Sequence, residues 1–127
     1  MASPQHGELN EAMDPFNVHT QAAELLEMAR ENSAGRAAYM PVGGPGTEMT
    51  QTVIALAGGF RLDEHENPGE ATVLVLSGEV ELGSGDSVWP GIEGDLIAVP
   101  DARHHLLAKT DATVLLTSVK RRSGLTA

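Results

Sequence analysis

The sequence has 127 residues, 18 of them acidic and 8 basic, with a formal net charge of −10 and no cysteine. This size fits one domain with one hydrophobic core, and the lack of cysteine excludes disulfides and thiolate ligands. A surface this negative repels phosphate backbones and anionic lipid headgroups, so we expect neither nucleic acid nor a membrane as a partner. The sequence also shows no secretory signal and no apolar run near the roughly 20 residues that span a bilayer. We therefore expect a cytoplasmic protein.

The N-terminal part of the chain combines an arm with a helix. Residues 1–16 are polar, lack periodicity and contain two prolines, so we interpret them as a flexible arm. A stripe of apolar residues at helical spacing follows, at Val18, Ala22, Leu25 and Ala29. The stripe predicts a helix over Val18–Glu31, which Asn17 or Thr20 could cap.

The rest of the chain consists of short β-rich runs separated by glycine turns. The candidate strands cover residues 36–42, 50–56, 72–76, 79–82, 87–89, 96–99, 104–108 and 113–119. Short strands at this regular spacing predict a β-sandwich or a closed β-barrel. We assign residues 17–120 to a single domain and residues 121–127 to a C-terminal tail. The basic cluster at residues 120–122 is interpreted as a solvated segment that partly offsets the acidic body.

Two stretches are more specific than the strand pattern. The first reads GFRLDEHENPGEATVLVLSG from Gly59 to Gly78, and the second reads GDLIAVPDARHH from Gly94 to His105. In this order, with strands between them, they resemble the paired motifs of the cupin family. The resemblance implies an all-β fold, a small cupin-type β-barrel (a double-stranded β-helix or jelly roll) with the N-terminal helix packed outside it. The whole chain looks like the short bacterial single-domain RmlC-like cupins of unassigned role.

The same resemblance implies a place for a metal. Cupins usually hold a divalent ion with three histidines and one glutamate, and His65 matches the first histidine. Asn67 stands at the second histidine and Ala71 at the glutamate, so one place offers only a neutral amide oxygen and the other no ligand. Glu70 is a neighbour of Ala71, but adjacent strand residues point to opposite faces. We therefore expect either no cofactor or a weakly bound divalent metal held by His65 and His104.

The second motif ends in two adjacent histidines. Family spacing from Pro100 selects His105 as the inward residue, whereas strand alternation places His105 on the same side as Lys109. Burying a lysine in an aliphatic barrel costs several kcal/mol unless it is paired, and no partner for Lys109 is evident from the sequence. We therefore predict that His104 faces the interior and His105 the exterior.

Three functions compete at this point. In the first, the barrel cavity binds a small organic ligand through polar contacts from His65, Asn67 and His104. Trp89 and Arg103 are further candidate ligand contacts, although a core or interface role for Trp89 and a plain surface charge for Arg103 compete with that interpretation. The absent glutamate favours this binding module over a metal enzyme.

In the second function, the chain is an enzyme acting on a small organic acid or a sugar derivative. The cupin resemblance implies oxygenase or isomerase chemistry if a metal is present, and a neutral histidine could act as general base without one. The third function is an interaction protein that uses its barrel face for assembly. Nothing in the sequence separates ligand binding from metal-free acid–base catalysis, and we assign no catalytic residue.

We also expect a homodimer. Cupins commonly pair through sheet edges, and residues 36–42 and 49–56 supply candidate edges.

Overall fold

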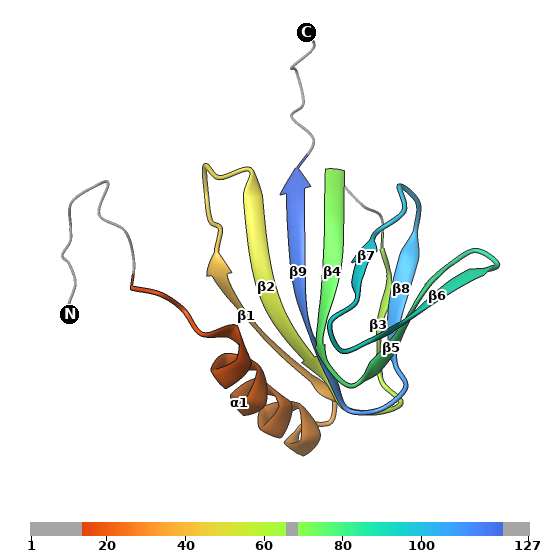
Figure 1. Cartoon of the computed structure of the whole chain (residues 1–127), viewed down its shortest axis with the longest axis horizontal. Helices are drawn as coiled ribbons and strands as arrows, with labels where there is room; N and C mark the ends of the chain where they lie inside the picture. The colour runs from red at the N-terminus through yellow and green to blue at the C-terminus, as the bar shows by residue number, and fades with distance from the viewer. Residues whose placement is uncertain (1–13, 66–68, 121–127) are drawn as a thin grey trace, which may run out of the picture.

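Figure 1 shows the computed structural model of the chain, which describes residues 14–65 and 69–120, without the side chains of Glu64 and His65. These residues form one helix and nine strands. The elements are α1 (Val18–Glu31), β1 (Arg36–Val42), β2 (Met49–Leu56), β3 (Arg61–His65), β4 (Gly69–Ser77), β5 (Glu79–Ser84), β6 (Ser87–Ile92), β7 (Leu96–Ala98), β8 (His104–Ala108) and β9 (Ala112–Lys120). The helix, a first sheet and a second sheet follow one another as three layers (Figure 1).

The two sheets face each other around an aliphatic core. Among the described residues, one sheet has the order β1-β2-β9-β4-β7 and the other the order β3-β8-β5-β6, and the paired strands are antiparallel. The buried side chains between them are Ile54, Leu56, Val73, Val75, Val80, Leu82, Val99, Leu106, Ala108, Ala112 and Val114. The predicted fold class, an all-β barrel with an N-terminal helix outside it, is confirmed.

Helix α1 begins and ends where the sequence predicts. The Asn17 side chain caps it by accepting a hydrogen bond of 2.9 Å from the Thr20 amide. Its buried face consists of Ala22, Leu25 and Ala29, with Val18 partly buried beside them. This face packs against the outer side of the five-stranded sheet, on Val53, Ala55, Leu74, Leu76, Leu115 and Ala37. The apolar stripe in the sequence is therefore the face that holds the helix to the sheet.

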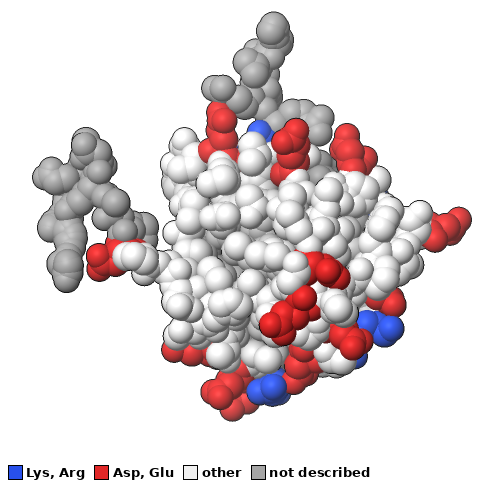
Figure 2. Space-filling view, in the orientation of Figure 1, with Lys and Arg blue, Asp and Glu red and all other residues white. Residues whose placement is uncertain are grey.

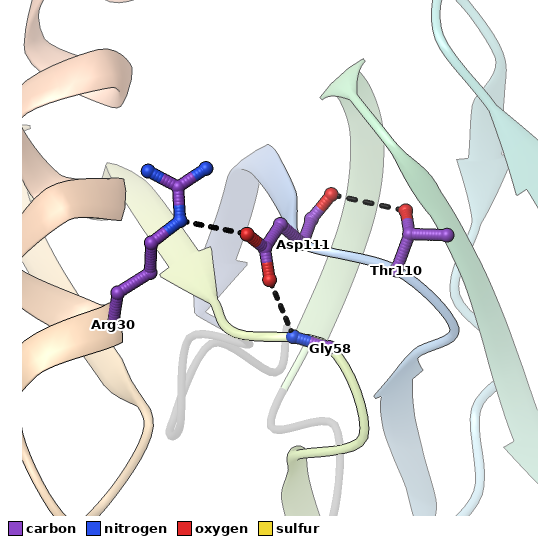
Figure 3. Close-up of polar contacts among 4 residues, drawn as sticks. All are labelled: Arg30, Gly58, Thr110 and Asp111. Carbon is purple, nitrogen blue, oxygen red and sulfur yellow. Dashed lines mark hydrogen bonds and ion pairs between the residues drawn. The ribbon is translucent and has the colours of Figure 1, made fainter.

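One carboxylate ties the C-terminal end of α1 to the barrel (Figure 3). Arg30 Nε donates a hydrogen bond of 2.7 Å to one oxygen of Asp111, and the Gly58 amide donates one of 2.8 Å to the other. The Thr110 hydroxyl donates to the Asp111 carbonyl at 3.0 Å, which orders the same turn. The bond from Gly58 first, and the bond and charge of Arg30 second, hold the pKa of the Asp111 carboxyl below its usual value.

Besides shifts of up to three residues at strand ends, the structure differs from the predicted strands in three respects. Strand β3 was not predicted, because Leu62 is the only apolar residue among its five and gives no alternation to detect. Strand β6 continues through Pro90 instead of ending at Trp89. Since β6 is an edge strand, a proline without an amide hydrogen can sit there without leaving a ladder bond unmade. Strand β2 lies between β1 and β9, so the prediction that residues 49–56 form a sheet edge is wrong.

The predicted arm and tail fall mostly outside the described residues, which exclude 1–13 and 121–127. The last residue of the arm, Phe16, is described, and its ring stacks on Tyr39 of β1 with the centroids 5.7 Å apart. Within residues 14–65 and 69–120 we find no helix of the length and apolarity needed to cross a membrane.

Candidate functional site

A small cavity, which we call the barrel recess, lies between the two sheets. Its volume is about 20 Å³, which is enough for about one water molecule. The recess is lined by Ile54, Leu62, Val73, Val99, His104, Leu106, Val114 and Leu116. Its wall is therefore aliphatic apart from one imidazole.

His104 is positioned by β8, whose alternate residues are buried. The side chain is only 6% exposed, and its Nδ1 lies 2.9 Å from the backbone carbonyl of Ala102. A carbonyl oxygen can only accept, so Nδ1 must carry the hydrogen of this bond. In the neutral ring, Nε2 is then the acceptor nitrogen. The Ala102 carbonyl thus fixes which nitrogen acts as acceptor, and no side-chain motif in the sequence signals that role.

His105 lies on the opposite side of β8 from the recess. Its ring covers Gly83 on the neighbouring strand β5, where even a Cβ atom would overlap the imidazole, and its Nδ1 is buried. Lys109, on the same side, donates a hydrogen bond of 3.1 Å to Glu81. His104 is therefore the inward residue, as strand alternation predicts. The partner of Lys109 could not be seen in the sequence because β5 and β8 are separated by some twenty residues of chain.

The other predicted site residues either fall outside the described side chains or are absent from the described lining of the recess. The backbone of His65, at the end of β3, is the ladder partner of His104, whereas its side chain and the whole of Asn67 lie outside the described residues. Trp89 is 40% exposed on the edge strand β6, and Arg103 is exposed just before β8. Neither belongs to the described lining of the recess.

The described residues do not fit the metal site that the cupin resemblance implies. Ala71 is partly buried against the core, and Glu70 is exposed on the other face of β4, as strand alternation predicts. His104 is the one described recess residue with a metal-binding side chain. Within the described part of the chain, no three His, Cys, Asp or Glu side chains lie close enough together to hold a metal ion. We therefore derive no chemistry through a metal.

Comparison with known proteins gives matches in structure only. Neither a family model nor a curated protein sequence matches the chain. An RmlC-like cupin protein from Desulfovibrio desulfuricans is 26% identical, with a TM-score of 0.65 over 84% of this chain and 95% of that one. A conserved protein of unknown function from Streptococcus pyogenes is 27% identical, with a TM-score of 0.65 over 72% and 80%. A cupin superfamily protein from Desulfitobacterium hafniense is 17% identical, with a TM-score of 0.65 over 76% and 88%.

Proposed function

Because this chain is a member of the cupin superfamily, we propose that it binds a small organic molecule in its barrel, at the recess that His104 lines. The observation that carries the proposal is a buried imidazole, held in one tautomer, in an otherwise aliphatic wall. A few placed polar groups in an apolar hollow are the usual composition of a small-molecule site. The Ala102 carbonyl supports binding by fixing the ring before a ligand arrives.

The size of the recess limits what can enter it. A volume of about 20 Å³ accepts roughly one heavy atom with its hydrogens, so a ligand inserts one end or displaces part of the lining. His104 supplies the polar group of the described lining, so it favours a ligand with one hydrogen-bonding end, such as an alcohol or a phenol. The formal charge of −10 disfavours polyanionic ligands such as sugar phosphates. The ligand class is therefore a compact, mostly apolar molecule with a hydroxyl group at one end.

The fixed tautomer also favours one alternative, in which His104 acts as general base. Proton abstraction requires a neutral imidazole whose acceptor nitrogen faces the substrate. The described lining of the recess supplies no second titratable side chain that could return the proton as an acid. Binding without turnover therefore remains the function that the described residues support best.

The test combines native mass spectrometry with a nuclear magnetic resonance titration. Protein purified without chelator is weighed intact to detect a retained ligand or metal. It is then titrated with propanol, tert-butanol, cyclohexanol and phenol while the His104 imidazole nitrogens and the methyl groups of Val99 and Leu116 are followed. We expect the resonances of these three residues to change in parallel when at least one of the probes is added.

A matched pair of variants separates the recess from non-specific binding. His104→Leu replaces the imidazole by an apolar side chain of similar size and should weaken probe binding about fivefold to tenfold, the usual effect of one lost hydrogen bond. His19→Leu changes an exposed histidine on α1 and should leave binding unchanged. The proposal is wrong if no probe moves the recess signals, or if His104→Leu binds the probes as well as the original protein. Turnover of a probe that requires His104 would instead favour the general base.

A further inference from the structure

A second hollow lies on the outer side of the five-stranded sheet, and its volume of about 360 Å³ is far larger than that of the barrel recess. We call it the outer groove. It lies over β4, β9 and the end of β7, and its lining is Glu70, Thr72, Ala98, Thr117 and Val119, with the adjacent Ala71 and Val99. Hollows of about 300–1,000 Å³ are the usual size of small-molecule sites. The outer groove is therefore large enough for a compact ligand.

The ladder register explains why the sheet is hollow there. Helix α1 packs on a row of large side chains, in which Leu74 of β4 lies opposite Leu115 of β9. Two residues nearer the start of β4, Thr72 lies opposite both Thr117 and Ala98. Opposed residues of antiparallel strands share a face, as do residues two apart on one strand, so both rows belong to the outer side. The second row consists of small side chains, which leave space above them.

Three polar side chains line this space. Glu70 is exposed, whereas Thr72 and Thr117 are partly buried. The Thr117 hydroxyl accepts a hydrogen bond of 3.1 Å from Gln51 Nε2, so its own hydrogen can be donated to another group. Within residues 14–65 and 69–120, no hydrogen bond or ion pair ties the side chain of Glu70 or Thr72 to another residue. The groove thus offers one carboxylate and two hydroxyls beside an apolar wall.

The charge around the groove favours a positively charged ligand. Lys120 is the basic residue of the described strands β4, β7 and β9, and strand alternation directs it away from the face that Val119 shares with Glu70. In Figure 2, the upper end of the molecule, where β9 ends and β4 begins, carries more Asp and Glu than Lys and Arg. The formal charge of −10 adds a longer-range attraction for cations.

We propose that the outer groove is a second binding site, for a compact organic amine that also carries a hydroxyl group. The ammonium group pairs with the Glu70 carboxylate, and the ligand hydroxyl accepts from Thr117 and donates to Thr72. Glu70 and Thr72 are two residues apart on β4, about 6.6 Å at 3.3 Å per residue, which sets the distance between the two ligand ends. Extended 4-amino-1-butanol spans about 6 Å from nitrogen to oxygen, given bond lengths of about 1.5 Å.

The exposure of Glu70 predicts weak binding. Solvent screens an ion pair with an exposed carboxylate, so such a pair usually changes an affinity by no more than about fivefold. The hydrogen bonds to the two threonine hydroxyls add to this attraction. We therefore expect a dissociation constant in the millimolar range that increases with salt concentration.

Nuclear magnetic resonance titration of the full chain with this amino alcohol tests the proposal. We expect the methyl signals of Thr72, Thr117 and Val119 to change together. The methyl signals of Leu62 and Leu106, which line the recess alone, should stay constant. The corresponding diol, in which a hydroxyl replaces the ammonium group, should bind about threefold to fivefold more weakly. Butylamine, which lacks the hydroxyl, should also bind more weakly.

Matched variants separate the groove from the overall charge of the chain. Glu70→Gln keeps the shape of the side chain and should weaken binding of the amino alcohol about threefold to fivefold, to the level of the diol, without weakening the diol. Asp86→Asn makes the same change of charge at the exposed β5–β6 turn and should leave binding unchanged. Thr72→Arg fills the groove and places its own cation near Glu70, so it should abolish binding of both compounds.

Circular dichroism of each variant separates lost binding from lost folding. Groove signals that stay constant at concentrations well above the millimolar range would overturn the proposal, whether the groove is covered by another segment of the chain, by a second copy or by nothing. Equal affinities for the amino alcohol and the diol would rule out pairing with Glu70. An equal loss in Glu70→Gln and Asp86→Asn would also overturn the proposal, because the ammonium group would then respond to the charge of the whole chain. The outcome does not depend on whether the barrel recess binds a ligand.

Discussion

Replacement of Asp111 by alanine should loosen the attachment of α1 to the barrel while leaving the fold intact. The substitution removes the acceptor of both the Arg30 and the Gly58 hydrogen bonds. Hydrogen bonds to charged groups contribute about 1.5–3 kcal/mol in general, but exposed ion pairs contribute only about 0.2–1 kcal/mol. The Arg30 and Asp111 side chains are 51% and 39% exposed, so the lower end of the range applies to that pair. We expect the free energy of unfolding to fall by about 1–2 kcal/mol at pH 7.

Urea denaturation followed by circular dichroism measures this change. The urea concentration at the midpoint should fall, while the slope of the unfolding free energy against urea concentration should stay constant, because the surface exposed on unfolding is unchanged. Arg30→Met should reduce the free energy of unfolding by less than Asp111→Ala does, because the hydrogen bond from Gly58 to Asp111 survives. In a protein that already carries Asp111→Ala, adding Arg30→Met should reduce it by almost nothing further. Asp86→Ala removes an exposed carboxylate from the β5–β6 turn and is the matched control.

The stabilisation by the Asp111 carboxylate should be lost in acid. Since the folded pKa of Asp111 is held below its ordinary value of 3.8, the folded chain keeps this carboxylate ionised where the unfolded chain is already protonated. The stabilisation is then fully present above the unfolded pKa and is lost as the pH falls through the folded value. The difference between wild type and Asp111→Ala should be constant from neutral pH down to about pH 5 and shrink below about pH 4. A difference that grows on acidification, or equal stability of the two proteins at pH 7, would contradict a stabilising role for the Asp111 carboxylate.

Two further predictions concern stability. Gly35→Ala should lower the free energy of unfolding, measured by thermal melts, by about 1–3 kcal/mol, because φ is +69° and the added methyl overlaps the Phe60 ring. Gly85→Ala should lower it by about 1 kcal/mol, because φ is +58° but no atom lies within 4 Å of the added methyl. Equal costs at the two glycines would mean that the contact with Phe60 is irrelevant. Lys109→Met should cost less than about 1 kcal/mol, because its ion pair with Glu81 is partly exposed, and the cost should vanish in molar salt. A cost that salt does not reduce would contradict a screened surface pair.

The sequence predicts those parts of the fold that depend on neighbouring residues. The helix follows from an apolar stripe of 3.6-residue period and a capping asparagine, both contained within Asn17–Glu31. Strand β3 escapes prediction because its single apolar residue, Leu62, carries no pattern. It is held in place by pairing with β8, which lies some forty residues further along the chain. The path of β6 through Pro90 likewise depends on β6 being an edge strand, which local sequence does not show.

In the candidate site too, features of one strand are predictable from the sequence and features that join several strands are not. Alternation along β8, together with the cost of burying a lysine, places His104 in the interior correctly. The narrow recess could not be predicted, because it depends on how Leu62, Leu116 and Val99 from different strands meet. The hollow on the outer side of the five-stranded sheet, the outer groove, could not be predicted either, because it depends on the register of β9, β4 and β7. Its lining is Glu70, Ala71, Thr72, Ala98, Val99, Thr117 and Val119. The roles proposed for His65 and Asn67 stay predictions.

The recess and the outer groove use opposite faces of the same strands. On β4, Val73 lines the recess and the adjacent Thr72 lines the groove, so Thr72→Arg changes one hollow without adding a group to the other. Val99, just after β7, lines both. A substitution at Thr72 therefore leaves the described lining of the recess unchanged, whereas a substitution at Val99 alters both hollows.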